Sequence, residues 1–442
     1  MCSGMPATLS AAASGAHCFV CSRKSTVGGA RLRRLLRMTS AAESISGGPA
    51  GYRAALAVRE FRAVFAAHLL SLLGLVTGEI ALSVLVYRTT GSPLLGALAF
   101  ALGFLPYLLG GTLLAGVADR YPARRVLVLC NLLCAASAVV TALPGAPVGV
   151  LLAMRCFSAL IGPVLAGTRS ATLGDVLGEG DLFVLGRSLI RIVTQGAQVA
   201  GFAAGGLLLT AVPPRTALLS TVAGFLASAL LLRFGTQRRP GRASGGAAVL
   251  RASLSGARQL LADRRIRALL LLSWLPPFFL VAPESLAAPY ADEIGAGTVG
   301  VGLLMCGMPV GTIVGEVLAG SLLGPRGRER LTLPAAAVLL LPFLLYALRP
   351  SLGWALCAVA LAGLGAAYTL GLDQWFVAAV PEELRGRAMT LQTAGTMTVQ
   401  GLGMALAGAA AEYAPVHWVV VGAGAVGTLV VGGVVRVVVG SA

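Results

Sequence analysis

The feature that most constrains the fold of this chain is a set of twelve apolar runs, each about long enough to cross a lipid bilayer. Hydrophobic residues make up 57% of its 442 residues and charged residues only 12%, about half the charged share of soluble domains. Inside a bilayer every backbone N–H and C=O group must be paired within the protein, as helices of about 20 residues allow. The sequence therefore predicts an all-α membrane protein with twelve transmembrane helices. The expected spans are 62–86, 93–118, 124–143, 147–168, 188–210, 214–233, 266–288, 298–323, 331–348, 352–373, 387–411 and 416–437.

The longest polar break between the runs divides them into two sets of six. Nine arginines lie in or beside this break, as expected for a cytoplasmic loop that joins two bundles. Met38 offers an alternative start, so the sequence leaves open whether residues 1–37 exist in the native protein. The predicted organisation is a disordered cytoplasmic tail (1–58), a six-helix bundle (59–233), a cytoplasmic linker (234–265) and a second six-helix bundle (266–438).

The placement of arginines predicts the orientation in the membrane. With the N-terminus inside, 23 arginines from residue 53 onward lie on the cytoplasmic side, and Arg88, Arg215 and Arg349 lie outside. The positive-inside rule therefore predicts that both termini are cytoplasmic. Because this topology accounts for the net charge of +17, we expect no nucleic-acid partner.

A short charged loop between the second and third runs carries the most specific motif. It reads Gly116-Val-Ala-Asp119-Arg120-Tyr-Pro-Ala-Arg124-Arg125. Gly116 allows close helix packing, and Asp119 can face the positive N-terminal end of a helix that begins near Gly386. The three arginines can pair with acids on the same side. We interpret the loop as a conformational latch. A plain basic loop that sets topology is the alternative, but it leaves the Gly-x-x-Asp-Arg pattern unexplained.

This motif resembles the loop between helices 2 and 3 of the major facilitator superfamily, and the resemblance covers residues from about 58 to 438. The resemblance implies two pseudo-symmetric six-helix bundles that rock around a central cavity. Within the superfamily the chain looks most like bacterial multidrug or metabolite efflux members, which implies a multi-pass protein of the plasma (inner) membrane.

Ionisable residues inside membrane spans are costly and therefore suggest function. Glu79 lies in span 1, Arg155 in span 4 and Glu284 in span 7, and the resemblance implies that these spans line the cavity. A carboxylate that alternates between a desolvated environment and a nearby arginine can bind and release a proton. We therefore predict that the three residues serve proton coupling. Alternatively, Glu284 sits at the membrane interface near Pro289.

Glycines and prolines predict helix packing and gating. Gly201, Gly205 and Gly206 make a smooth stripe on span 5, which resembles the glycine-rich motif of antiporters, although Phe202 replaces the usual proline. Generic helix packing is the alternative. Pro276 and Pro277 are expected to break span 7 near its middle, as a hinge or gate, or as a purely structural kink.

The predicted function is secondary active transport by alternating access, with proton-coupled efflux of a hydrophobic or amphipathic small molecule. Uptake of a small metabolite and a non-transporting membrane sensor or scaffold are the alternatives. We expect no enzymatic activity, no cofactor and no metal, because neither a nucleotide-binding loop nor a ligand cluster occurs in the sequence. The expected partners are the small-molecule substrate, protons and the lipid bilayer, and the protein is expected to be a monomer.

Overall fold

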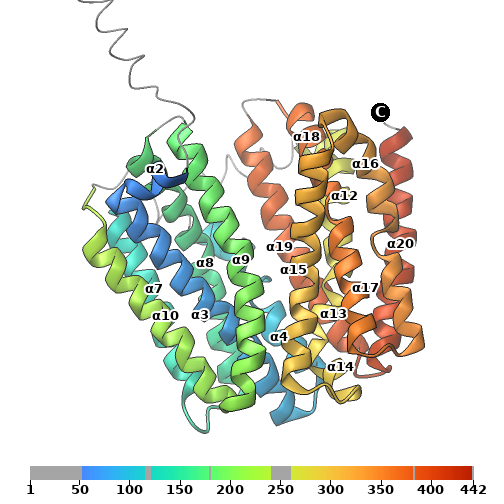
Figure 1. The fold of residues 1–442 in the computed structure, drawn as a ribbon, viewed down its shortest axis with the longest axis horizontal. Helices are drawn as coiled ribbons and strands as arrows, with labels where there is room; N and C mark the ends of the chain where they lie inside the picture. The colour runs from blue at the N-terminus through green and yellow to red at the C-terminus, as the bar shows by residue number, and fades with distance from the viewer. Residues whose placement is uncertain (1–51, 115–120, 179–180, 240–259, 382–383, 441–442) are drawn as a thin grey trace, which may run out of the picture. The chain divides into compact units, whose positions relative to one another are not determined.

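A computed structural model describes residues 52–114, 121–178, 181–239, 260–381 and 384–440. These residues belong to one compact unit, and no strand occurs within them. Ten helices in the described ranges are long and apolar enough to cross a membrane. The protein is thus an all-α, multi-pass membrane protein, and its helices form two bundles that lie side by side (Figure 1).

The N-terminal bundle is built around α3, the helix that packs against α4, α9 and α10. Its helices are α2 (Tyr52–Ala57), α3 (Arg59–Thr90), α4 (Pro93–Ala101), α5 (Tyr107–Leu113), α7 (Ala123–Ala142), α8 (Val148–Leu177), α9 (Asp181–Ala211) and α10 (Pro214–Gly235).

The C-terminal bundle contains more interrupted helices than the N-terminal one. Its elements are α12 (Arg264–Leu280), α13 (Ala282–Ser285), α14 (Ala287–Glu293), α15 (Gly297–Leu322), α16 (Pro325–Val338), the 3-10 helix η1 (Leu341–Leu348), α17 (Leu352–Gly365), α18 (Tyr368–Ala379), α19 (Arg385–Ala410) and α20 (Val416–Gly440).

Two of the twelve predicted spans are not among the ten apolar helices. The predicted span 93–118 is divided into α4 and α5, each too short to cross a bilayer alone. The predicted span 387–411 corresponds to α19, which has 26 residues but carries several threonines and glutamines. In both cases a helical segment occupies the predicted place, and its length or polarity differs from that of a simple apolar span.

The break in span 7 lies later than we predicted from Pro276 and Pro277. Helix α12 continues through both prolines to Leu280, and the chain then turns at Val281 and Leu286. A helical proline frees the carbonyl four residues before it. For Pro276 this is the carbonyl of Leu272, which accepts a hydrogen bond from the hydroxyl of Tyr368 at 3.3 Å. This tertiary contact satisfies the freed group and so allows the helix to continue.

The end of the predicted disordered tail is ordered. Residues 52–57 form α2, and Ala55 within it is fully buried. Leu56 and Val58 also pack into a small apolar cluster that includes Phe61. The apolar side chains of this short segment explain why it docks on the bundle. The rest of the predicted tail lies outside the described residues.

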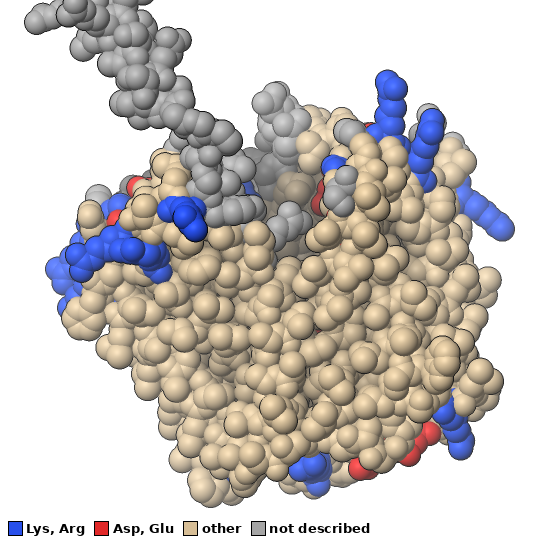
Figure 2. Space-filling view, in the orientation of Figure 1, with Lys and Arg blue, Asp and Glu red and all other residues tan. Residues whose placement is uncertain are grey.

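Exposed arginines gather at one end of both bundles, which we call the Arg-rich end (Figure 2). They include Arg59, Arg62, Arg125, Arg233, Arg238, Arg264, Arg265, Arg326 and Arg330. The described surface is recessed between the two bundles at this end (Figure 2). The other end, which we call the closed end, holds the contacts between the bundles.

At the closed end, α9 packs against α15 and α4 packs against α19. Gly206 and Gly302 allow α9 and α15 to approach closely, because a Cβ atom on Gly206 would lie 2.8 Å from the Cα atom of Gly302. Small residues permit such close helix packing inside a membrane. The two bundles therefore meet backbone to backbone at this end.

Candidate functional site

An ion pair joins α3 and α8 inside the N-terminal bundle. The Nη2 atom of Arg155 donates a hydrogen bond to the Glu79 carboxylate, and Nε donates to the carbonyl of Ala99 at 3.3 Å. Both side chains are largely buried, with 8% of Arg155 and 16% of Glu79 exposed. A buried pair of this kind is stable only while both partners are present, because either charge alone would be uncompensated. The structure thus brings together two of the residues that we predicted for proton coupling.

The break between α4 and α5 makes room for this ion pair. Gly103 lies in that break, and a Cβ atom at this position would collide with the guanidinium of Arg155. The absence of a side chain at Gly103 therefore allows the arginine to reach Glu79. The interruption of the predicted span 93–118 is thus part of the geometry of the site.

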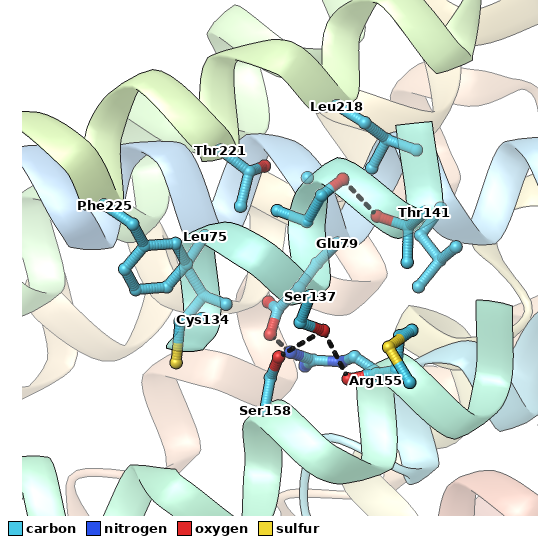
Figure 3. A pocket seen from close by; sticks show the side chains of 14 residues that line it. Leu75, Glu79, Cys134, Ser137, Thr141, Arg155, Ser158, Leu218, Thr221 and Phe225 are labelled. Atoms are coloured by element: carbon cyan, nitrogen blue, oxygen red, sulfur yellow. Dashed lines mark hydrogen bonds and ion pairs between the residues drawn. The ribbon is translucent and has the colours of Figure 1, made fainter. Parts of the chain in front are cut away.

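The ion pair lines a cavity of about 40 Å³ within the N-terminal bundle (Figure 3). This volume admits a few water molecules but no larger ligand. Ser158 donates to the hydroxyl of Ser137 at 3.0 Å, and Ser137 donates to the carbonyl of Met154 at 2.9 Å. The lining residues are Leu75, Gly78, Glu79, Leu82, Cys134, Ser137, Ala138, Thr141, Met154, Arg155, Ser158, Leu218, Thr221 and Phe225.

Glu284 approaches the ion pair from the other bundle. It lies in α13, is partly buried, and interacts electrostatically with Glu79. Two carboxylates that interact in this way repel each other when both are ionised, and a proton or a cationic group would relieve the repulsion. The three residues predicted for proton coupling therefore form one electrostatic group that extends across both bundles.

A second polar network, which we did not predict from the sequence, lies nearer the Arg-rich end. Arg169 lies just beyond the predicted span 147–168, but α8 continues to Leu177 and places Arg169 inside the bundle. Its Nη1 lies 2.8 Å from Nδ1 of His68, and Nε2 of His68 lies 3.1 Å from the hydroxyl of Thr194. Because arginine can only donate, Nδ1 accepts and Nε2 carries the proton of a neutral imidazole. If the end of span 4 had been predicted correctly, Arg169 would have been recognised as a second arginine within that span.

The predicted latch is only partly within the described residues. Gly116, Asp119 and Arg120 lie outside them. Arg124 donates a hydrogen bond to the carbonyl of Arg233 at the end of α10, and Arg125 is exposed. Arg124 thus caps a neighbouring helix, where a cation is favourable next to the unpaired carbonyls.

The glycine stripe of α9 packs on two different helices. A Cβ atom on Gly201 would lie 2.7 Å from the side chain of Val76, and one on Gly205 would lie 3.2 Å from Ile80, both on α3. Gly206 instead faces Gly302 on α15 in the other bundle. The stripe therefore contributes both to packing inside one bundle and to contact between the two.

Glu412 links the bundles at the closed end. Its carboxylate accepts hydrogen bonds from the Ser92 hydroxyl and from the backbone N–H of Leu94, the latter at 3.0 Å. The hydrogen bond from Ser92, followed by that from the Leu94 N–H, lowers the pKa of Glu412. The carboxylate also lies at the N-terminus of α4, where the helix dipole favours a negative charge.

Two helical bundles that touch at one end, with a buried ion pair beside a small polar cavity, are typical of a membrane transport protein. The chain belongs to the Major Facilitator Superfamily, because the family model matches residues 64–374, more than half of its length. It is therefore a membrane transporter and not an enzyme, with a small molecule as substrate.

Solved structures of other transporters share the fold. A mutant of the nucleoside transporter NupG has a TM-score of 0.71 and 14% identity, covering 85% of this chain and 99% of its own. A POT family transporter in complex with a thioalcohol-conjugated peptide has a TM-score of 0.67 and 12% identity, and the match covers 84% of this chain and 94% of that transporter. A bacterial homologue of the human lysosomal transporter Spinster, solved in an inward-facing and unoccupied conformation, has a TM-score of 0.59 and 17% identity. The match covers 87% of this chain and 95% of that homologue. No curated protein matches the sequence.

Proposed function

We propose that this protein is a proton-coupled exporter of a hydrophobic or amphipathic small molecule that works by alternating access in the plasma (inner) membrane of a bacterium. The Arg-rich end and both termini face the cytoplasm in this proposal, as the positive-inside rule favours. The bundles meet at the opposite end, so the conformation described above is inward-facing. The transporter acts as a monomer.

The observation that carries the proposal is the Arg155–Glu79 ion pair beside a cavity of water-molecule size. While Glu79 is ionised, the pair holds α3 and α8 together. When Glu79 takes up a proton, the attraction is lost and the guanidinium of Arg155 is released. The two protonation states therefore favour different arrangements of these helices. Protonation can in this way be coupled to rocking of the bundles.

The proposed substrate class and the proposed direction of transport rest on separate observations. The helices of the bundles present few aromatic or charged residues, which suits an apolar or amphipathic compound better than a sugar. The repulsion between the carboxylates of Glu79 and Glu284 would favour a substrate with a cationic group. Export is supported by the resemblance of the α9 glycine stripe to the glycine-rich motif of antiporters, although Phe202 replaces the usual proline. In this proposal the Gly116–Arg125 loop acts as the cytoplasmic latch.

The experiment is to measure the accumulation of a panel of amphipathic fluorescent dyes in cells with and without the protein, before and after the proton gradient is collapsed. We expect lower accumulation of at least one dye in cells that contain the protein, and loss of this difference after collapse. Higher accumulation would instead indicate uptake. An unchanged accumulation for every dye would favour a sensor or scaffold.

A further inference from the structure

The cavity beside the ion pair belongs entirely to one bundle. Its lining residues come from α3, α7, α8 and α10, and none of them comes from the C-terminal bundle. It is therefore distinct from the space between the bundles, through which an alternating-access transporter moves its substrate. A cavity that is separate from the substrate path can serve a different, smaller species.

The cavity extends towards the closed end of the molecule. Thr141 is the second-last residue of α7, Leu218 lies in the second turn of α10, and Met154 lies in the second turn of α8. All three positions are near the helix ends opposite the Arg-rich end. The lining thus begins within about two turns of the closed-end surface and continues inward to Glu79.

Towards the Arg-rich end the cavity is bounded by apolar side chains. Cys134 and Phe225 line its inner part and belong to a buried apolar cluster, against which Leu75 also packs. The same cluster contains Val126, Cys130, Ala135, Ile161 and Val164. An apolar constriction of this kind excludes water and so interrupts proton conduction. A buried apolar cluster therefore lies between the cavity and the Arg-rich end.

Hydroxyl groups line the cavity between its two ends. Ser137, Ser158, Thr141 and Thr221 all contribute. Each of these hydroxyls donates its proton to a protein oxygen and keeps lone pairs that can accept hydrogen bonds from water. A few water molecules fit among them, because the volume is about 40 Å³. Such a lining supports a chain of water molecules that ends at the Glu79 carboxylate.

We propose that this cavity is a separate proton route, which connects Glu79 with the aqueous phase at the closed end while the bundles remain in contact there. A hydronium ion in the cavity gives its proton to an oxygen of Glu79 and leaves water, and the hydrogen bond from Arg155 to that carboxylate breaks. The proton thus reaches the coupling residue without passing between the bundles. This inference rests on the proposed proton coupling.

Two native cysteines of similar burial allow a matched test. Cys134 is 4% exposed and lines the cavity, whereas Cys130 is 7% exposed, lies one turn away and does not line it. The experiment compares two single-cysteine variants, each keeping one of these thiols. Ag⁺, which is small enough to follow water, is added to one side of sealed vesicles, and the remaining free thiol is then labelled after denaturation. Arg88→Cys and Arg238→Cys variants mark the two ends of the molecule.

We expect Ag⁺ to block Cys134 about tenfold faster than Cys130, and from the Arg88 side only, because the apolar cluster excludes water on the other side. Ala138→Leu should fill the cavity, slow the reaction of Cys134 and abolish proton-driven dye transport. Thr141→Leu serves as a second blocking variant if Ala138→Leu does not fold. Equal rates for the two thiols, or access to Cys134 from the Arg238 side, would overturn the proposed route.

The outcome separates this inference from the proposed function. A reactive Cys134 in a protein without proton-driven transport would refute proton coupling. Proton-driven transport in a protein with an unreactive Cys134 would refute only the separate route.

Discussion

The carboxylate of Glu412, which follows α19, accepts a hydrogen bond from the backbone N–H of Leu94 in the first turn of α4, with 3.0 Å between the two atoms. Ser92, the N-cap residue of α4, donates to the same carboxylate. One acid thus joins the C-terminal bundle to a helix N-terminus of the N-terminal bundle. This contact must break before the closed end can open.

Replacing this acid should weaken closure. Glu412→Gln keeps the shape of the side chain but removes the charge, and charge-assisted hydrogen bonds are the stronger kind. We expect the population that is open at this end to increase by no more than about fivefold, because exposed charged contacts are weak. The distance between spin labels on Thr90→Cys and Tyr413→Cys measures this population. An unchanged distance distribution would show that Glu412 does not hold the closed end.

The same contact predicts the effect of pH. The pKa of Glu412 is lower in the closed form than its ordinary value, so its contribution to closure is fully present above the ordinary glutamate pKa of about 4.3. The contribution is lost as the pH falls through the lowered pKa. The label distance should therefore be constant between about pH 6 and pH 8 and should lengthen only in acid. Glu412→Gln should show no such acid transition, and a transition near neutral pH would contradict the assignment.

The Gly206–Gly302 contact predicts that a single methyl group opens the closed end. A Cβ atom on Gly206 would lie 2.8 Å from a backbone atom of Gly302, which cannot move without separating α9 from α15. Overpacking of this kind costs about 1–3 kcal/mol, so Gly206→Ala should increase the open population about tenfold. Gly196→Ala is the matched control on the same helix, because no atom beyond its chain neighbours and the backbone of its own helix lies within 4 Å of the added methyl group. Equal effects of the two variants would contradict this account.

Gly103→Ala should impair function without unfolding the protein. The added methyl group collides with the end of the flexible Arg155 side chain, which can move aside only by leaving Glu79. We expect proton-driven transport to fall about tenfold, as when a positioned group is displaced from its partner. Gly111→Ala, whose methyl group would lie 3.7 Å from Pro163, is the control. A melting temperature well below that of this control would show a structural defect instead.

The sequence predicted the helices, and it singled out part of the candidate site, because both depend on local signals. Apolar runs of membrane length and costly charges inside them are visible without a fold, so Glu79 and Arg155 could be selected. Their direct contact could not be predicted, because it depends on Gly103 in a third segment. The hydrogen bond from Tyr368 to the Leu272 carbonyl was equally hidden, and it explains why α12 continues through Pro276.

Helix ends were the main source of error. The predicted end at residue 168 left Arg169 in a loop, whereas α8 continues to Leu177 and places this arginine next to His68. Glu412 was missed for a different reason. It lies in a connecting segment, where an acid is not costly and gives no local sign of a distant partner. Its role depends on the packing of α19 against α4, which brings together residues more than 300 positions apart.

The most direct test of the account is substrate-dependent proton movement by the purified protein in lipid vesicles, followed with a trapped pH-sensitive dye. The wild-type protein should move protons when an amphipathic substrate is added, and Glu79→Gln, which cannot alternate between ionised and protonated forms, should not. Proton movement by Glu79→Gln at the wild-type rate would contradict the central claim that the Arg155–Glu79 pair couples protons to transport.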